Sequence, residues 1–254
     1  MLNGQNAPTP SSGSDDETEL MRQEIASKDI TYLQSRVVYR YDYKSLEGDA
    51  FANRFRAKVL YGFGSDNRFG FSAMLPVIHK WSPTDSATGI GDMEFQFGGF
   101  FHKGESFSTG AIIELDGATA SDPLLGGSST DLKGTWGFTQ VFRPRYELTA
   151  LFNYKHSIYI NRGSGTNEFE PDITISTRRF GATWFFEYDS YYLFIPEEYA
   201  QTTKVGVSKV FGKGRHWVAT PYWSFPINGA GRQTQYQNNI GLDLNWFPEF
   251  MNRR

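Results

Sequence analysis

Strict alternation between apolar and charged side chains is the feature that most constrains this chain. When the stretch RVVYRYDYK is read in twos, Val37, Tyr39, Tyr41 and Tyr43 fall on one face, and Arg36, Arg40, Asp42 and Lys44 fall on the other. Successive side chains of a β-strand point to opposite faces, whereas a helix repeats every 3.6 residues. The stretch therefore predicts a strand with one aromatic face and one charged face.

The same alternation recurs along most of the chain. The expected strands cover residues 36–44, 51–63, 68–77, 91–101, 106–117, 131–142, 146–159, 202–211, 216–227 and 235–247, with two more inside 172–198 whose dividing turn the pattern does not place. Short connections alternate with long ones, and residues 79–89, 118–130 and 160–171 are expected to be long loops, exposed outside around Ser86, Gly126 and Gly165. Outer-membrane barrels sort their connections in this way, with short periplasmic turns and longer outer loops. We therefore expect an all-β protein, a transmembrane antiparallel up-and-down β-barrel of about 12 strands.

Composition decides which solvent the aromatic face meets. The 254 residues include 22 Phe and 14 Tyr, yet only 39% are hydrophobic and the mean hydropathy is −0.48. A membrane helix needs about 20 consecutive apolar residues, and no such run occurs, whereas a barrel strand needs only about 9 to 11 residues of alternating polarity. The aromatic face is therefore expected to face lipid. The alternative is a water-soluble antiparallel barrel in which the aromatic face forms the core.

The ends of the chain differ from its middle. Residues 1–31 are expected to be a flexible leader with a short helix, because Ser14 and Glu17 have the spacing of a capping box ahead of Leu20 and Met21. The alternative is a plug that enters the barrel. Residues 32–248 are expected to form the barrel, and 249–254 a polar C-terminal tail. The first residues lack a basic and an apolar signal-peptide region, so we expect a signal removed from a bacterial outer-membrane protein.

Several function classes are disfavoured by what the sequence contains. The net charge of −3 argues against a nucleic-acid partner, and the lack of cysteine excludes disulfides and thiol chemistry. The four histidines, His79, His102, His156 and His216, are too far apart along the chain to suggest a shared metal. No serine lies in a G-x-S-x-G motif. We therefore expect no catalytic residues, no metal and no cofactor, in a protein that is not an enzyme.

The charged faces are the candidate functional site. With the apolar face outward, one wall of the lumen is expected to be basic and the neighbouring wall acidic. The basic residues are Arg36, Arg40, Arg54, Arg56, Lys58 and Arg68, and the acidic residues are Asp92, Glu94, Glu114 and Asp116. Opposed charges set ion selectivity in narrow pores. The alternative is that these groups pair with one another across the lumen.

The segment GIGDMEFQFGGFF, the stretch TWGFTQVF and the ending IGLDLNWFP resemble the outer-membrane MetA-pathway phenol degradation family. This resemblance implies a transporter-like channel for small solutes, including aromatic or other hydrophobic compounds. A second similarity, carried by YRYDYK and an arginine-dense strand, is to the monomeric oligogalacturonate porins, which implies a channel for acidic sugars. An outer-membrane barrel enzyme acting on lipid is the remaining alternative. The expected partners are outer-membrane lipid, a small-molecule solute and the outer-membrane assembly machinery.

Overall fold

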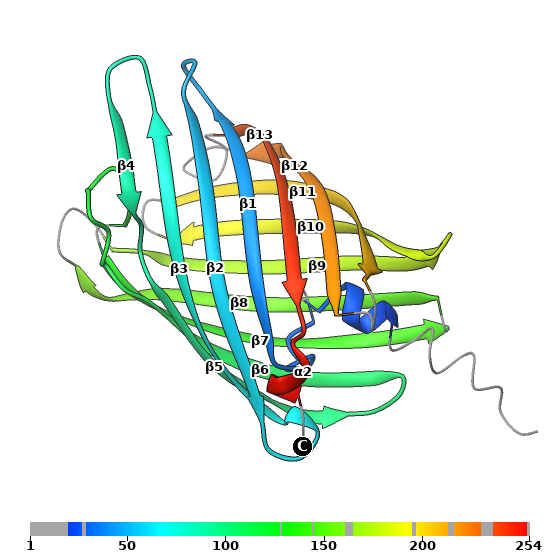
Figure 1. Ribbon diagram of the computed structural model, residues 1–254. Coiled ribbons are helices and arrows are strands. Elements are labelled where there is room, and N and C mark those ends of the chain that lie inside the picture. The colour runs from blue at the N-terminus through cyan, green and yellow to red at the C-terminus, as the bar shows by residue number, and fades with distance from the viewer. Residues whose placement is uncertain are drawn as a thin grey trace, which may run out of the picture.

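The chain folds into a β-barrel (Figure 1). The computed structural model describes residues 20–26, 29–127, 129–143, 145–160, 165–194, 197–212, 216–229 and 236–252. The strands are β1 (Arg36–Leu46), β2 (Phe51–Phe63), β3 (Phe69–Trp81), β4 (Ser86–Ile90), β5 (Glu94–Lys103), β6 (Phe107–Asp116), β7 (Ser129–Arg143), β8 (Tyr146–Ile160), β9 (Asn167–Arg179), β10 (Ala182–Phe194), β11 (Glu197–Phe211), β12 (Trp217–Gly229) and β13 (Tyr236–Trp246). A 3-10 turn, η1 (Ser65–Asn67), and a short helix, α2 (Glu249–Asn252), complete the described elements.

Each strand pairs antiparallel with its neighbours, and β1 pairs with β13 to close the barrel. The short strand β4 and the strand β5 share one position, because both pair with β3, β4 along its second half and β5 along its first half. The barrel therefore has 12 strand positions, which confirms the predicted fold class. No described helix is long and apolar enough to cross a membrane.

Two expected loops were wrong, and one turn that the pattern left open is now placed. Residues 79–89 are not a loop, because β3 continues to Trp81 and turns tightly at Ser82–Asp85 into β4. Strand β9 begins at Asn167, inside the expected loop 160–171. The turn missing from 172–198 lies at Phe180 and Gly181, which both have positive φ, at 56° and 71°. Two positive φ values suit a tight hairpin turn, but Phe-Gly lacks the Asn-Gly or Asp-Gly signature that would reveal one.

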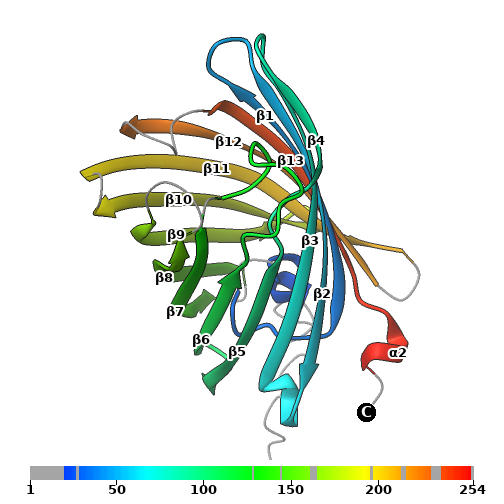
Figure 2. The same cartoon turned by 90° about the vertical axis from the view of Figure 1, so that its left-hand side faces the viewer.

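The two ends of the barrel differ. At one end lie η1, α2, the turn between β5 and β6 and the residues before β1, and we call this the plug end (Figures 1 and 2). At the other end the β1–β2 and β3–β4 hairpins project, and the connection between β6 and β7 lies there too; we call this the loop end (Figure 1). The turns expected to be periplasmic, those after β2, β5, β7 and β11, all fall at the plug end. Which end faces the periplasm stays a prediction.

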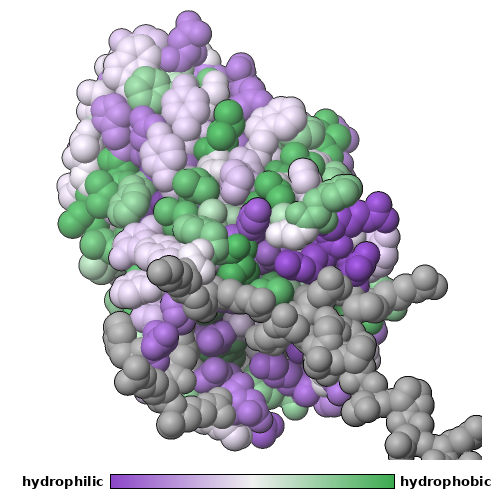
Figure 3. Space-filling view, turned by 45° about the vertical axis from the view of Figure 1, so that its right-hand side comes forward, coloured by the Kyte–Doolittle hydropathy of each residue, from purple (hydrophilic) through white to green (hydrophobic). Residues whose placement is uncertain are grey.

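The outer surface of the barrel carries many apolar side chains, and green groups of them lie among white and pale purple residues across the middle of Figure 3. Tyr41, Phe55, Phe71, Phe97 and Trp136 are each between 44% and 50% exposed. Many of these rings contact one another across strands; Trp217 and Trp246, for example, lie opposite each other in register with centroids 5.7 Å apart. A continuous apolar surface of this extent is unfavourable in water and favourable in lipid. The aromatic face is therefore the lipid-facing surface, and the buried core of a soluble barrel is excluded.

Adjacent residues on β3 provide a test of the two faces. Leu75 is exposed on the outer surface, whereas Met74 lines the lumen and lies opposite Glu94. We expect Leu75→Arg to cost about 2 to 4 kcal/mol of folding stability, because it buries a charge in the hydrocarbon. Met74→Arg is expected to cost much less, since its charge lies beside a carboxylate in the lumen. Denaturant unfolding in lipid vesicles measures both costs, and equal costs would mean that the faces have been exchanged.

Candidate functional site

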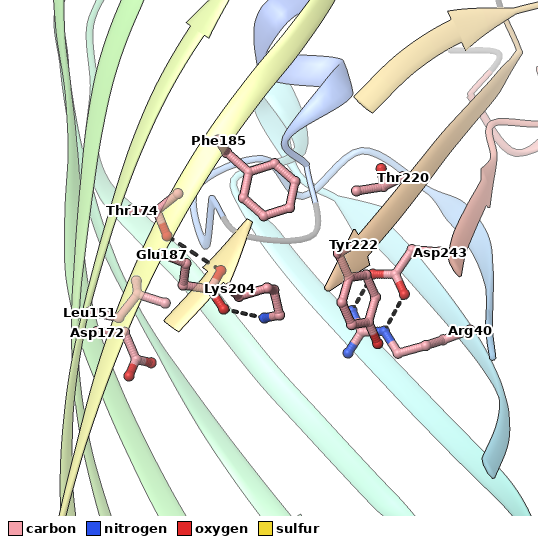
Figure 4. A pocket seen from close by; sticks show the side chains of 10 residues that line it. All are labelled: Arg40, Leu151, Asp172, Thr174, Phe185, Glu187, Lys204, Thr220, Tyr222 and Asp243. Atoms are coloured by element: carbon pink, nitrogen blue, oxygen red, sulfur yellow. Dashed lines mark hydrogen bonds and ion pairs between the residues drawn. The ribbon is translucent and has the colours of Figure 1, made fainter. Parts of the chain in front are cut away.

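The lumen contains a series of polar cavities that share lining residues. A central cavity of about 160 Å³ is lined by Arg40, Tyr222 and Asp243 on one side and by Glu187 and Lys204 on the other (Figure 4). A second cavity, of about 280 Å³, shares Arg40 with the first. A third, of about 470 Å³, shares Arg56, Met74 and Glu94 with the second and reaches the loop end. The cavities therefore adjoin one another from the middle of the barrel to the loop end.

Many charges on the lumen wall are paired, but mostly with residues outside the set that the alternative interpretation named. Arg40 forms two hydrogen bonds with Asp243, of 2.5 and 2.6 Å, across the β1–β13 junction. Arg56 binds Asp42 on the neighbouring strand at 2.6 Å. Lys58 donates to Gln96 at 2.5 Å and lies 3.6 Å from Glu94. The partners of Arg40 and Arg56 are thus not the carboxylates of the expected acidic wall. Asp243 lies opposite Arg40 in register, whereas Asp42 lies diagonal to Arg56, opposite Arg54.

The carboxylates of the acidic wall also have hydrogen-bond donors inside the barrel. Carboxylate oxygens of Glu94, Glu114 and Asp116 lie within 4.8 Å of one another, close enough to hold a cation. However, Gln96 donates one hydrogen bond to Glu94 and another to Glu114. Lys155 binds Asp116 at 2.7 Å. Donors from the chain therefore already occupy this cluster, and it does not suit a metal.

Three of the expected lumen residues have other surroundings. Arg68 is exposed beside η1 and lines none of the cavities described above. Arg36 lines the second cavity, but its guanidinium donates to the carbonyls of Ala26 and Tyr32, each at 2.8 Å. Asp92 borders the loop-end cavity but accepts hydrogen bonds from backbone N–H groups of the β6–β7 connection. The position of Arg68 therefore does not support its expected role in the permeation path. Arg36 and Asp92 border the lumen, but they are engaged in structural contacts.

The residues before β1 fill the plug end of the lumen. We call residues 20–26 and 29–35 the plug. Met21 is fully buried, and Ala26 and Tyr32 pack with Val218 and Phe247 in one apolar cluster. Figure 2 shows this blue segment between the walls of the barrel. For these residues, burial favours the plug over the flexible leader; the expected cap at Ser14 lies outside the described residues.

The plug fits a wall that leaves room for it. A Cβ added at Gly70 would lie 3.1 Å from Leu33 Cδ2, and one at Gly62 would lie only 2.0 Å from the Leu33 carbonyl oxygen. A Cβ at Gly137 would lie 3.3 Å from Ile30 Cδ1. These three glycines lie on β2, β3 and β7, so the plug contacts widely separated parts of the wall. The plug therefore spans the lumen at this end.

Glu24 anchors the plug to the opposite wall. Its carboxylate has no exposed surface and accepts hydrogen bonds from Arg178 on β9, from Thr183 Oγ1 on β10 at 2.5 Å and from the Val210 backbone N–H on β11 at 3.1 Å. Arg22 adds hydrogen bonds to the carbonyls of Gly104, at 2.9 Å, and Glu105, at 2.8 Å, in the β5–β6 turn. A buried carboxylate held by three donors is a strong contact, because it satisfies a charge that burial would otherwise penalise.

The connection between β6 and β7 is fixed against the loop-end cavity. Asp92 accepts hydrogen bonds from the N–H groups of Thr119 at 2.9 Å, Ala120 at 3.0 Å and Gly127. Leu125, in the same connection, is only 5% exposed and lines the cavity. Residues 124–127 therefore form part of the cavity wall, and exposure of the loop around Gly126 on the outside of the membrane stays a prediction.

No protein-family model matches the chain, and no curated protein matches its sequence. Its structure is similar to that of an outer-membrane channel from Pseudomonas putida F1, with a TM-score of 0.70 and 9% identity over 86% of this chain and 97% of that one. It is also similar to the NanC porin, with a TM-score of 0.60 and 9% identity over 83% of this chain and 98% of that one. The KdgM porin gives a TM-score of 0.54 and 14% identity over 81% of this chain and 97% of that one. The chain has the fold of an outer-membrane channel.

This fold, together with the lipid-facing surface, indicates the bacterial outer membrane. The particular resemblance to the phenol degradation family is not tested by these similarities and stays a prediction.

Sequence reasoning missed the charged residues of the later strands. These are Lys133, Lys155, Glu170, Asp172, Glu187, Lys204 and Asp243, which lie on the lumen side and form or flank the ion pairs. Alternation within each strand places them inward as clearly as it does Arg40 and Arg56. Their pairing, however, follows from register between strands and has no signal in the local sequence.

Proposed function

We propose that the protein is an outer-membrane channel through which small water-soluble solutes diffuse. The observation that carries this proposal is the series of polar cavities that share lining residues inside a closed, lipid-facing barrel. A purely structural barrel of this size could fill its lumen with packed side chains instead. The plug obstructs one end, so passage requires the plug to shift.

The lining favours polar and charged solutes over wholly apolar ones. Ion pairs such as Arg40–Asp243 and Glu187–Lys204 flank the central cavity, where Phe185 supplies an apolar ring. Water and small polar solutes can exchange hydrogen bonds with such walls, whereas a hydrocarbon cannot. Aromatic compounds, which the family resemblance implies, fit this path when they carry a charged or polar group.

The junction between two cavities offers the test. Met74 lines both the second cavity and the loop-end cavity, so Met74→Trp should narrow the path between them. We expect conductance in planar bilayers to fall several-fold, and liposome swelling with small sugars to slow in parallel. Leu75→Trp, on the outer face of the same strand, is the matched control and should leave both unchanged. Equal conductance of Met74→Trp and the unmodified protein would contradict the proposed path.

A further inference from the structure

The loop-end cavity contains a cluster of cations on three adjacent strands. Lys44 on β1 and Lys80 on β3 both lie opposite Ala52 on β2 in the strand register. Since neighbouring strands are about 4.8 Å apart, the Cα atoms of the two lysines are about 10 Å apart, with only a methyl group between them. Arg54 follows Ala52 by two residues on the same face, about 7 Å along the strand. All four residues line the cavity.

The carboxylates that share this cavity are already engaged. Asp92 binds the backbone of residues 119–127, and Asp116 binds Lys155. Asp131 accepts hydrogen bonds from Ser129 at 2.7 Å and Ser157 at 2.6 Å. Glu94 accepts from Gln96 and lies near Lys58. The acidic side of the cavity therefore has little charge left to offer to the cations on the other side.

Arg54 and Lys80 have no such partner. Neither forms an ion pair with any residue that the structure describes, and the buried Nε of Arg54 has no hydrogen-bond acceptor there. The nearest carboxylate to Arg54 in register, Asp42, is bound by Arg56 instead. Lys44 lies within electrostatic range of Arg54 and Arg56 as well as of Asp42, the carboxylate that Arg56 binds. Like charges gathered in a partly buried cavity repel one another unless an anion joins them.

Part of the cavity lining is apolar. Leu46, Ile78, Leu124 and Leu125 contribute to it, and Ile78 lies directly opposite Arg54. A guanidinium binds a carboxylate through two parallel hydrogen bonds, and ammonium groups add charge without directional demands. A ligand with two carboxylates and a compact apolar body would therefore satisfy both parts of the lining.

We propose that the loop-end cavity is a binding site for small organic dicarboxylates, held by Arg54, Lys80 and Lys44. This inference rests on the proposed function, because the site lies on the proposed permeation path. Small organic dicarboxylates would then be a class of solute that uses this path. The binding itself does not require passage.

Calorimetric titration of the full-length protein in detergent with phthalate, at low salt, tests the site. We expect saturable binding that weakens at least tenfold in Arg54→Gln/Lys80→Gln and that is lost at 1 M salt, where the Debye length is about 3 Å. Lys209→Gln, an exposed lysine of β11 outside the cavity, is the matched control and should bind as the unmodified protein does. Heat-modified migration on gels verifies that each variant is folded.

Undiminished binding in the folded double variant would overturn the site, as would equal losses in Lys209→Gln. Inorganic phosphate should bind more weakly than phthalate because it lacks an apolar body, and the reverse order would overturn the organic part of the proposal. Bilayer recordings separate this inference from the proposed function. A protein that binds phthalate without conducting refutes the channel alone, and one that conducts without binding phthalate refutes the site alone.

Discussion

Glu24→Ala is expected to open the plug end of the barrel. The substitution removes the acceptor for Arg178, Thr183 and the Val210 N–H and leaves a largely buried guanidinium without its partner. Breaking a buried pair in this way costs about 3 to 5 kcal/mol, and 3 kcal/mol corresponds to a change on the order of a hundredfold in an equilibrium. The substitution destabilises only the closed position of the plug. The ratio of open to closed time of the channel should therefore rise on the order of a hundredfold. Single-channel recording measures it directly.

The control for this variant is Glu249→Gln. Glu249 lies at the same end in α2, is largely exposed and contacts His216 outside the plug. Glu249→Gln should therefore leave the single-channel recordings unchanged. The hydrogen-bonded ladder of the barrel does not involve Glu24, so the variant should still migrate as a folded barrel on unheated gels. A folded Glu24→Ala variant with unchanged conductance would show that the plug does not limit passage.

Arg56→Gln is expected to cost about 3 to 5 kcal/mol of stability, because it leaves Asp42 charged and buried. The Asp42 side chain is only 1% exposed and Arg56 is its ion-pair partner. Arg54→Gln, one inward position away on the same strand, breaks no ion pair with a described residue and should change stability little. Denaturant unfolding in lipid vesicles compares the two variants.

The double variant Arg56→Gln/Asp42→Asn separates charge burial from packing. It removes the unpaired carboxylate, so it should recover part of the stability lost in Arg56→Gln. Equal stability of Arg54→Gln and Arg56→Gln would mean that the Arg56–Asp42 ion pair is too hydrated to contribute to folding stability. Arg54 and Arg56, which look equivalent in the sequence, are therefore expected to act differently, one on solute binding and the other on stability.

Much of the barrel could be predicted from local patterns. The outward positions of Phe55, Phe71 and Phe97 follow from alternation alone, since a strand fixes the face of each side chain relative to its neighbours. The missing turn at Phe180 and the β3–β4 hairpin could not be placed in the same way. Their residues carry weak turn signals, and pairing with neighbouring strands extends each strand beyond the point where the alternation becomes unclear.

The sequence by itself determined that this chain forms amphipathic strands and that their aromatic face meets lipid, because both depend on residues two apart and on composition. Only the tertiary structure decided which charges meet. Arg40 pairs with Asp243, 203 positions away, because closing the barrel places β1 beside β13 in one register. The tertiary structure also decided that Glu24 and Met21 lie inside the lumen. A segment with few apolar residues looks solvated until a surrounding wall supplies the donors and the glycine-lined space that make its burial favourable.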